Sequence, residues 1–547
     1  MHVSDKSDSR SHETPATQVR RNGDENALSS KRVRVVVTVA IIVGLVGIGL
    51  LFAMAQRRPR RVGNSTIIQV KSGGDLQAAI KNANYGDVIV LEAGGTYRGP
   101  IILPFKESTS DSEQYITITT SNLKGIPGEN QRVNPQTHAA AMPKILGPDS
   151  SVAIATEERA HHYKFVGIEF APAEDSNYLY NLIDLGKTEY KSLDQFPHHL
   201  VFDRCYIRST GLKKARRGFG LNSGDTTISN SYISGFAGEG DETQGICGWN
   251  GPGPFKIINN YIEGGGQNIM FGGADPAVPN LVPSNIEIRR NFLYKPREWF
   301  GQATIKAMIE LKNARKVVID GNVIESGGLV GAFVLTVRNQ GGTAPWSTLE
   351  DITITNNIVR HSNTGFSILG QDNYKPSQQA KRIRIANNLL VDIVPDYSAV
   401  FMIGCCGNTI IVENNTVQQT GNVMTCYGNI HSNFVFRNNI IQFNEYGFVC
   451  PQNLMTPDSR GNTIVDNRGI IAGNGYPHNI PKGNPVVSSL DQVGFVNYAE
   501  GDWRLTPQAQ AKRKGVDGKA VGVDFEALGA AVSATDVEAP YFGKRKK

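Results

Sequence analysis

Three charged residues that could act together lie between residues 305 and 342: Glu310, Lys312 and Arg338. A lysine beside an arginine has a lowered pKa, because the neighbouring positive charge disfavours protonation, and it can then take a proton from a substrate. We therefore predict that Lys312 and Arg338 are catalytic. The alternative is a surface ion pair between Glu310 and Lys312, with Arg338 stacked beside it.

Strand alternation predicts how these side chains are positioned, because successive residues of a β-strand point to opposite faces. Ile309 would point into a core, and Glu310 and Lys312 would point out. One repeat later, Leu335 would point in and Arg338 would point out. If Ile309 stacks on Leu335, 26 residues further on, Lys312 becomes a neighbour of Arg338.

These strands belong to a repeat that fills most of the chain. Alternating β-branched or aromatic residues lead to an asparagine-like position, after which another short strand follows. Successive positions of this kind are 24 to 35 residues apart, a period that predicts one solenoid rather than separate domains. The residues at this position are Cys205, Ser231, Asn260, Asn291, Asn322, Asn357, Asn388, Asn415 and Asn439.

The recurring asparagine has a structural explanation. Asparagine tolerates the left-handed backbone conformation of a sharp bend, and its amide bonds to neighbouring backbone. Stacked coils would bring these amides about 4.8 Å apart, so we expect a ladder of side-chain hydrogen bonds along the solenoid. The asparagine series is therefore assigned to the fold and not to a site.

A short amphipathic helix near residues 75–84 would cover the first coil, whose apolar end and strand edges would otherwise be exposed. The pattern of this segment consists of Leu76, Ala79, Gly86, Asp87, Ile89 and residues 94–97. It resembles the N-terminal cap of the right-handed parallel β-helix proteins of the pectin-lyase-like superfamily. The resemblance implies an all-β chain, a right-handed parallel β-helix of about ten or more coils.

A second, local resemblance concerns the charged residues. The stretch contains, in order, Glu310, Lys312-Asn313, Gly321-Asn322, Ser326-Gly327 and Arg338-Asn339. This order resembles the site of polysaccharide lyases typified by chondroitinase B and the alginate lyases. The resemblance implies that Lys312 takes the C5 proton of a uronate, that Arg338 helps to protonate the leaving oxygen, and that Glu310 holds Ca²⁺. The family's second calcium carboxylate falls near Met308, which is not a calcium ligand.

Three tryptophans in loops of nearby coils are candidates for binding sugar rings by stacking: Trp249, Trp299 and Trp346. Alternation also places Gly272 beside Lys312 on the preceding coil, where the missing side chain would leave room for a sugar. The alternative for the tryptophans is that they cover the flank of the solenoid.

The cysteines and histidines give weaker signals. The six cysteines show no zinc-binding spacing. Cys405, Cys426 and Cys450 lie roughly one repeat apart, so they either stack as small buried side chains or form a disulfide. Two histidine pairs, at 161–162 and 198–199, precede core strands, and we interpret them as loop residues rather than ligands.

The positive net charge belongs to the two ends of the chain. The whole sequence has a formal charge of +6. Residues 1–61 contain 11 Lys/Arg and 5 Asp/Glu, and residues 544–547 add four further positive charges. The remaining body therefore has a charge of −4, which argues against a nucleic-acid partner.

The N-terminal region is expected to lie outside the solenoid. Residues 1–34 are polar and predict a disordered tail. Residues 35–55 contain no charge, and 21 residues of helix span about 30 Å, the thickness of a bilayer core. This segment predicts a transmembrane anchor; the alternative is a long signal peptide cleaved near the Ala-Met-Ala at 53–55.

Together these features predict a β-helix over residues 62–506, followed by a C-terminal cap and basic tail over 507–547. We expect a monomer that acts on or binds polysaccharide. It would be single-pass, with the β-helix on the extracytoplasmic side, or secreted after signal cleavage. Cleavage of a uronate-containing glycan by β-elimination would make it a polysaccharide lyase. The alternatives are non-catalytic binding of a glycan or cell envelope, and a purely structural solenoid.

Overall fold

The computed structural model describes residues 65–107, 114–327, 330–394, 399–429, 431–451, 454–475, 480–512 and 515–533. The predicted tail at 1–34 and the predicted membrane anchor at 35–55 lie outside the described residues. Among the residues that are described, no helix combines the length and the hydropathy needed to cross a bilayer.

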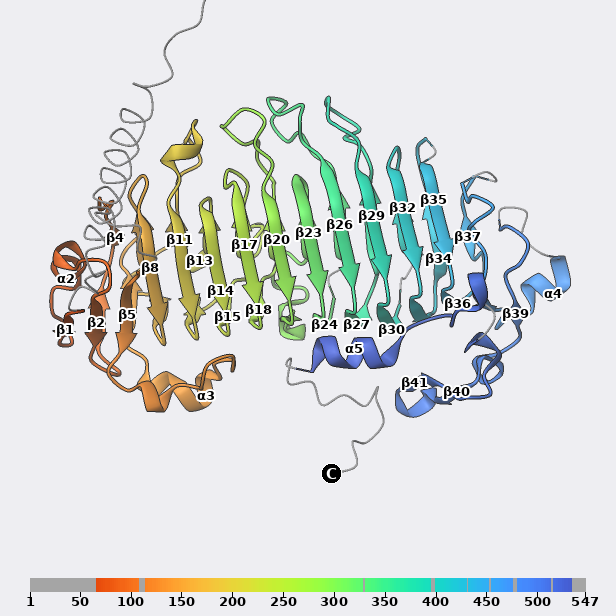
Figure 1. Ribbon diagram of the computed structural model, residues 1–547, viewed down its shortest axis with the longest axis horizontal. Coiled ribbons are helices and arrows are strands. Elements are labelled where there is room, and N and C mark those ends of the chain that lie inside the picture. The colour runs from red at the N-terminus through yellow and green to blue at the C-terminus, as the bar shows by residue number, and fades with distance from the viewer. Residues whose placement is uncertain are drawn as a thin grey trace, which may run out of the picture. The chain divides into compact units, whose positions relative to one another are not determined.

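From residue 67 to residue 487 the chain winds through three parallel sheets in turn, and the coils from β2 to β37 place one strand in each sheet (Figure 1). Sheet 1 consists of β1 (Ile67–Val70), β2 (Val88–Leu91), β5 (Ile116–Thr120), β8 (His161–Val166), β11 (His198–Asp203), β14 (Gly224–Ser229), β17 (Gly253–Ile258), β20 (Ser284–Arg289), β23 (Ala314–Asp320), β26 (Leu349–Thr355), β29 (Lys381–Ala386), β32 (Asn408–Glu413) and β35 (Ser432–Arg437).

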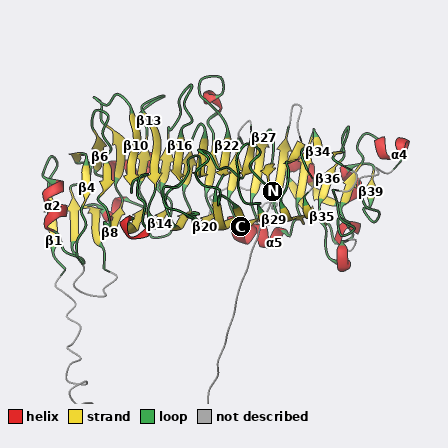
Figure 2. Cartoon of the chain, turned by 90° about the horizontal axis from the view of Figure 1, so that it is seen from above, coloured by secondary structure: helices red, strands yellow, loops and turns green. Residues whose placement is uncertain are grey.

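The other two sheets run alongside it, and Figure 2 shows the same stack turned by 90°. Sheet 2 consists of β3 (Thr96–Arg98), β6 (Lys144–Gly147), β9 (Glu169–Pro172), β12 (Tyr206–Arg208), β15 (Tyr232–Ser234), β18 (Tyr261–Glu263), β21 (Phe292–Tyr294), β24 (Val323–Glu325), β27 (Ile358–Ser362), β30 (Leu389–Ile393), β33 (Thr416–Gln419), β36 (Ile440–Gln442), β38 (Thr463–Val465) and β39 (Val486–Val487). Sheet 3 consists of β4 (Ile101–Leu103), β7 (Ile154–Thr156), β10 (Leu179–Leu185), β13 (Ala215–Leu221), β16 (Gln244–Gly248), β19 (Gln267–Phe271), β22 (Ala307–Leu311), β25 (Gly331–Thr336), β28 (Phe366–Leu369), β31 (Ala399–Ile403), β34 (Asn422–Cys426) and β37 (Phe448–Val449).

The core consists of like side chains stacked from coil to coil, because the parallel register places equivalent residues opposite each other. In sheet 3, Phe333, Phe366 and Phe401 stack with ring centroids 4.8 and 5.4 Å apart, and all three are fully buried. Aromatic stacks of this kind add to the free energy gained by burying the rings. The alternation seen in the sequence is thus confirmed as the pattern of inward residues.

The asparagine ladder is confirmed. The backbone N–H of Asn291 donates to the side-chain oxygen of Asn322 at 2.9 Å, and the amide of Asn291 donates to the same oxygen at 3.0 Å. The ladder continues beyond the predicted series to Asn462 and Asn484. At its other end the hydroxyl oxygen of Ser231 accepts a hydrogen bond from the backbone N–H of Cys205. Each buried amide is satisfied by the next coil, as a close-packed interior requires.

Sheet 3 departs from simple alternation at the start of each strand. Met308 and Ile309 are consecutive, yet both are fully buried in the central core. Ala332 and Phe333 repeat this arrangement one coil later. The chain turns a corner here, and two successive side chains point inward. Met308, the position near which the resemblance placed a second calcium carboxylate, is therefore a core residue.

The predicted N-terminal helix is α2 (Leu76–Asn82). The carboxylate of Asp75 caps it by accepting from the N–H of Ala78 at 2.8 Å. Such a cap stabilises a helix by about 1 kcal/mol. Leu76 and Ile80 are buried in the core of the first coil, so the helix covers the end of the stack as expected.

Three other α-helices and one antiparallel pair are described: α3 (Pro135–His138), α4 (Ile470–Asn474), α5 (Phe525–Val532), and β40 (Phe495–Asn497) with β41 (Asp502–Leu505). The segment from 493 to 532 does not cover the end of the last coil. It folds back along sheet 2, where Leu528 and Val532 of α5 join a cluster with Val323 and Ile358 (Figure 1). The predicted C-terminal cap is thus a strap along the flank. The described apolar residues that join the main core near the end of the stack are Leu454, Met455, Ile471 and Ile480.

Candidate functional site

The register of sheet 3 differs from the predicted one. In the pairing of β22 with β25, Ile309 lies opposite Phe333, and Leu311 lies opposite Leu335. The offset is 24 residues, so the predicted stack of Ile309 on Leu335 is wrong. Beyond the strand ends, however, the N–H of Arg338 donates to the carbonyl of Lys312 at 3.0 Å. The two residues are therefore backbone neighbours on adjacent coils.

Glu310 and Lys312 form one ion pair on the outer face of sheet 3. The Lys312 Nζ lies 3.4 Å from Glu310 Oε1, and the other carboxylate oxygen accepts a 2.6 Å hydrogen bond from the amide of Gln267. Only 17% of the Lys312 side chain and 11% of the Glu310 side chain are exposed. The predicted outward orientation of both residues holds, but neighbouring side chains cover most of their surface.

The guanidinium of Arg338 is directed to the following coil. Its Nη1 lies 3.2 Å from Asp372 Oδ1 and 2.6 Å from Asn373 Oδ1, and the group lies over the ring of Tyr374. None of these partners belongs to the coil of Lys312. The structure thus brings Glu310 and Lys312 together, whereas Arg338 approaches Lys312 through its backbone.

Gly272 lies beside Lys312 on the preceding coil, as predicted, but the predicted space for a sugar is absent between these two residues. A Cβ atom added to Gly272 would lie 2.7 Å from the Cβ of Lys312 and 3.1 Å from the backbone nitrogen of Asn313. Gly272 also has a backbone φ of +105°, which disfavours other residues. Glycine at this position therefore permits the close approach of the two coils.

A polar row that the sequence did not reveal leads away from Glu310. It consists of Asn181, Arg217, Gln244, Gln267 and Glu310, which lie in adjacent strands of sheet 3. Arg217 Nε donates to Gln244 at 2.8 Å, and Gln244 donates to Gln267 at 2.9 Å. The members of this polar row are buried beneath other side chains, so solvent meets the row mainly at its edges.

One edge of the polar row carries a second lysine–carboxylate pair. Lys306 is ion-paired with Glu242, and Glu242 also accepts a 3.4 Å hydrogen bond from Gln267. Burial alone would raise the pKa of the Glu242 carboxyl, but Lys306 and Gln267 hold this pKa below its usual value. Both side chains are 37% exposed, so this pair is open to solvent.

The far end of the polar row combines a carboxyl group with aromatic rings. Asp184 accepts a 2.8 Å hydrogen bond from Asn181, and burial raises the pKa of Asp184 to about 6. The Arg217 guanidinium lies 4.7 Å from the ring centroid of Tyr180 and 5.1 Å from that of Trp249. Arg216 lies 5.0 Å from the centroid of the Tyr180 ring as well, and Tyr180 remains 52% exposed.

The three predicted sugar-binding tryptophans have separate surroundings. Trp249 contacts Arg217 at the end of the polar row. Trp299 is only 9% exposed and packs with Ala237 and Ile305. The indole N–H of Trp346 donates to the carbonyl of Leu281, and the ring borders a different cavity, of about 480 Å³. The structure therefore does not bring the three rings into one binding surface, and only Trp249 joins the polar row.

The residues around Glu310 do not fit Ca²⁺. Calcium requires six to eight oxygen ligands. The Glu310 oxygens are occupied by the Gln267 amide and the Lys312 ammonium, and Glu242 is paired with Lys306. Among the described residues, no third carboxylate joins Glu310 and Glu242 closely enough to share an ion with them. No step of the chemistry proposed below passes through calcium.

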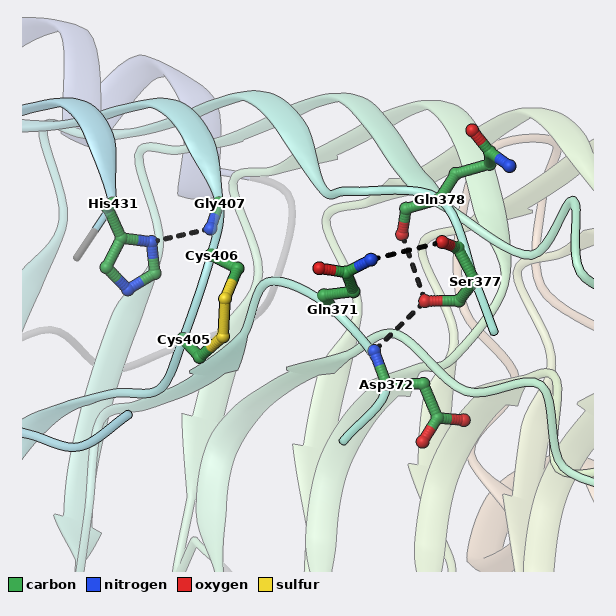
Figure 3. The surroundings of a disulfide bond; sticks show 8 residues. All are labelled: Gln371, Asp372, Ser377, Gln378, Cys405, Cys406, Gly407 and His431. Atoms are coloured by element: carbon green, nitrogen blue, oxygen red, sulfur yellow. Dashed lines mark hydrogen bonds between the residues drawn. A yellow bond between two sulfur atoms is a disulfide. The ribbon is translucent and has the colours of Figure 1, made fainter. Parts of the chain in front are cut away.

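Two disulfides replace the expected stack of small thiols, so the disulfide alternative holds. Cys426 and Cys450, on adjacent strands, are joined with their Cα atoms 4.8 Å apart. Cys405 is joined to Cys406, beside His431 and the loop that carries Asp372 (Figure 3). Asp372 is ion-paired with Arg338, so this disulfide lies next to the loop that positions the Arg338 side chain.

A basic cavity lies on the opposite part of the molecule. It measures about 830 Å³ and is bordered by sheet 1 and the C-terminal strap. Its described lining residues include Arg384, Arg504, Lys512 and Lys519, and Asp524 is the one carboxylate among them. Arg384 is paired with Glu413 and Arg504 with Asp502, so Lys512 and Lys519 are the cations that a polyanion would contact.

Comparison with known proteins supports the fold. No known protein family and no curated protein matches the chain. Among solved structures, it is similar to the PL6 family alginate lyase AlyGC, with a TM-score of 0.53 and 15% identity over 88% of this chain and 59% of that one. The chain is a parallel β-helix. A mannuronic acid-specific family 6 polysaccharide lyase from the human gut microbiota gives a TM-score of 0.42 at 12% identity, over 86% of this β-helix and 100% of the lyase.

Proposed function

We propose that this β-helix acts on an acidic, uronate-containing polysaccharide at the outer face of sheet 3. The observation that carries the proposal is the ammonium of Lys312, whose side chain is 17% exposed and paired with Glu310 at the end of the polar row. A lysine placed there can bind or deprotonate a uronate whose neighbouring sugars extend along the sheet. The AlyGC lyase shares this fold over 59% of its own length.

The chemistry would be β-elimination. Lys312 would first lose its ammonium proton to solvent. The neutral amine would then take the C5 proton of the uronate, the C4–O bond would break, and the electron pair of the broken C5–H bond would form a C4–C5 double bond. The departing oxygen takes a proton to complete the reaction. Glu310 balances the charge of Lys312 in the absence of substrate, and a uronate carboxylate would compete with Glu310 for the ammonium.

The test is the ultraviolet absorbance of the unsaturated product, measured on a panel of uronate polymers with and without added Ca²⁺. We expect Lys312→Ala to abolish the signal, since an effective general base contributes about 10²–10⁴ in rate. Lys306→Ala is the matched control, because it removes a lysine on the same face and should retain most activity. Absence of product from every uronate polymer rules out the elimination.

Non-catalytic binding is the second candidate, and the arrangement at Arg338 favours it. The guanidinium of Arg338 faces Asp372 and Asn373, whereas a proton donor to the leaving oxygen should face Lys312. Binding without cleavage predicts that Lys312→Ala still binds polysaccharide, whereas Trp249→Ala does not. The double variant Lys512→Ala/Lys519→Ala tests the basic cavity. Loss of polysaccharide binding in that variant alone would show that the polysaccharide binds in this cavity.

We further propose that the β-helix lies outside the cytoplasm, either anchored through residues 35–55 or released after cleavage. The two disulfides support this placement, because such bonds persist in oxidising compartments. Protease added to intact cells should degrade the β-helix if it is exposed at the surface. Protection in intact cells, together with free thiols at Cys426 and Cys450 in the purified protein, would contradict the proposal.

A further inference from the structure

Four histidines meet on the outer edge of sheet 1, near the N-terminal end of the solenoid. The histidine pairs that the sequence analysis placed in loops instead begin β8 and β11, where His161 lies opposite His198 in the parallel register. The same register stacks the rings in two layers. The rings of His161 and His198 are 5.0 Å apart, and those of His162 and His199 are 4.4 Å apart.

The ring nitrogens of this histidine cluster converge. One nitrogen from each of His162, His198 and His199 lies within 4.8 Å of the other two. Zinc–nitrogen bonds of 2.0–2.1 Å hold the ligand atoms of a tetrahedral ion about 3.3 Å apart. The His199 side chain is 40% exposed, so its ring can rotate and bring its nitrogen closer to those of His162 and His198. Three imidazoles from two adjacent coils can therefore share one ion.

The backbone explains why both histidines of a pair face the same edge. His162 and His199 have positive φ angles of 58° and 53°. The same conformation recurs near the start of later strands of sheet 1, at Asn285, Asp351 and Arg382. The bend is thus a property of the fold, and the histidines use it to bring two rings per coil to one corner.

The surroundings suit imidazole ligands. His162, His198 and His199 are each partly buried, so their rings are held by neighbours while one side remains open to solvent. The Nε2 of His199 lies 3.3 Å from a carboxylate oxygen of Asp225 on the third coil. The hydroxyl of Tyr85 lies 3.1 Å from both ring nitrogens of His161. Carboxylate and hydroxyl partners of this kind fix the orientation and tautomer of metal-binding histidines.

We propose that His162, His198 and His199 form a binding site for a divalent transition metal of the zinc class, with His161 and Asp225 as supporting residues. Neutral imidazole nitrogens prefer Zn²⁺, Cu²⁺ and Ni²⁺ over Ca²⁺ and Mg²⁺. The ion would join two coils next to the N-terminal cap, far in sequence from Lys312. Because the four histidines meet only in the folded solenoid, binding would stabilise it.

The experiment uses the untagged full-length chain after treatment with a chelator, titrated with Zn²⁺ in a calorimeter. We expect one Zn²⁺ per chain and a higher thermal unfolding midpoint when Zn²⁺ is present. Replacing Zn²⁺ by Co²⁺ should give the visible absorption of a nitrogen-coordinated ion. The variants His162→Ala and His199→Ala should each weaken binding at least tenfold.

His138→Ala is the matched control, because His138 belongs to the separate helix α3 and should not change zinc binding. His162→Gln keeps a polar side chain of similar size and provides a second variant should the alanine substitution fail to fold. The proposal is overturned if the wild-type chain binds no stoichiometric Zn²⁺, or if a folded His162→Gln/His199→Gln double variant binds it as tightly as the wild type.

Discussion

Two rows of polar side chains run along this β-helix, and they differ in the residue types that they contain. The asparagine ladder repeats one residue type from Asn260 to Asn484, and each amide bonds to the next. The polar row of sheet 3 changes from Asn181 to Arg217, to glutamines and then to Glu310. A structural requirement that is the same in every coil explains the repeated asparagine. The mixed residue types of the polar row indicate a requirement that differs from coil to coil. This difference is the reason to look for function in the polar row.

The largest effect is expected when one asparagine of the ladder is removed. Asn322→Ala deletes the acceptor for two donors of Asn291 and removes the donor to Asn357. Because water cannot reach these groups, we expect the free energy of unfolding to fall by about 3–5 kcal/mol. Denaturant unfolding followed by circular dichroism measures the loss.

Asn373→Ala is the control for this rung. Asn373 is an exposed loop asparagine that contacts Arg338, and its loss should cost about 0.5 kcal/mol or less. Equal losses in the two variants would show that the ladder contributes no special stability.

The next largest effect is expected at Asp184, where the polar row ends. Its folded pKa of about 6 lies above the unfolded value of about 3.8, so the native state holds the proton more tightly. Asp184 therefore lowers stability progressively as pH rises from about 4 to about 6, by roughly 3 kcal/mol in all. Asp184→Asn should be more stable than the wild type at pH 7, and the difference should vanish near pH 3. A stability difference that is constant with pH would show that Asp184 titrates normally.

A smaller effect, on binding alone, is expected at the exposed aromatic ring. Tyr180 lies over Arg217 and is 52% exposed to solvent. Tyr180→Ala should weaken binding of an acidic polysaccharide about tenfold, or about 1.4 kcal/mol, while leaving stability nearly unchanged. Tyr374→Ala, which removes a ring over Arg338, is the matched control. If both tyrosine variants bind equally well, the polar row does not mark the binding surface.

The sequence predicted the features that repeat and missed those that depend on loop length. The asparagine series, the N-terminal helix and the outward side of Glu310 and Lys312 follow from local pattern alone. The offset of 24 residues between β22 and β25 could not be predicted, because several inward residues near Leu335 could align with Ile309. The inward turn of Met308 was missed for a related reason, since the corner interrupts strict alternation.

The polar row was missed because its members become neighbours only when the register is known. Gln244 and Gln267 each stand two residues before an inward isoleucine, at Ile246 and Ile269, and this recurrence is the signal that could have been used. The direction of the Arg338 side chain had no such signal, because it depends on Asp372 in a loop of the following coil.

The smallest effect is expected when glutamine and asparagine are exchanged between the two rows. This pair of substitutions tests directly whether the polar row is as important for stability as the asparagine ladder. Gln244→Asn shortens a member of the polar row by one methylene and separates it from Arg217 or Gln267. The flexible Arg217 side chain can move to restore the hydrogen bond, so we expect a loss of about 1 kcal/mol or less. The reciprocal change, Asn388→Gln, adds a methylene to a fully buried rung and should cost about 1–3 kcal/mol. If Gln244→Asn proves the more costly of the two, the polar row is itself a structural ladder, and the argument for function would rest on Lys312 alone.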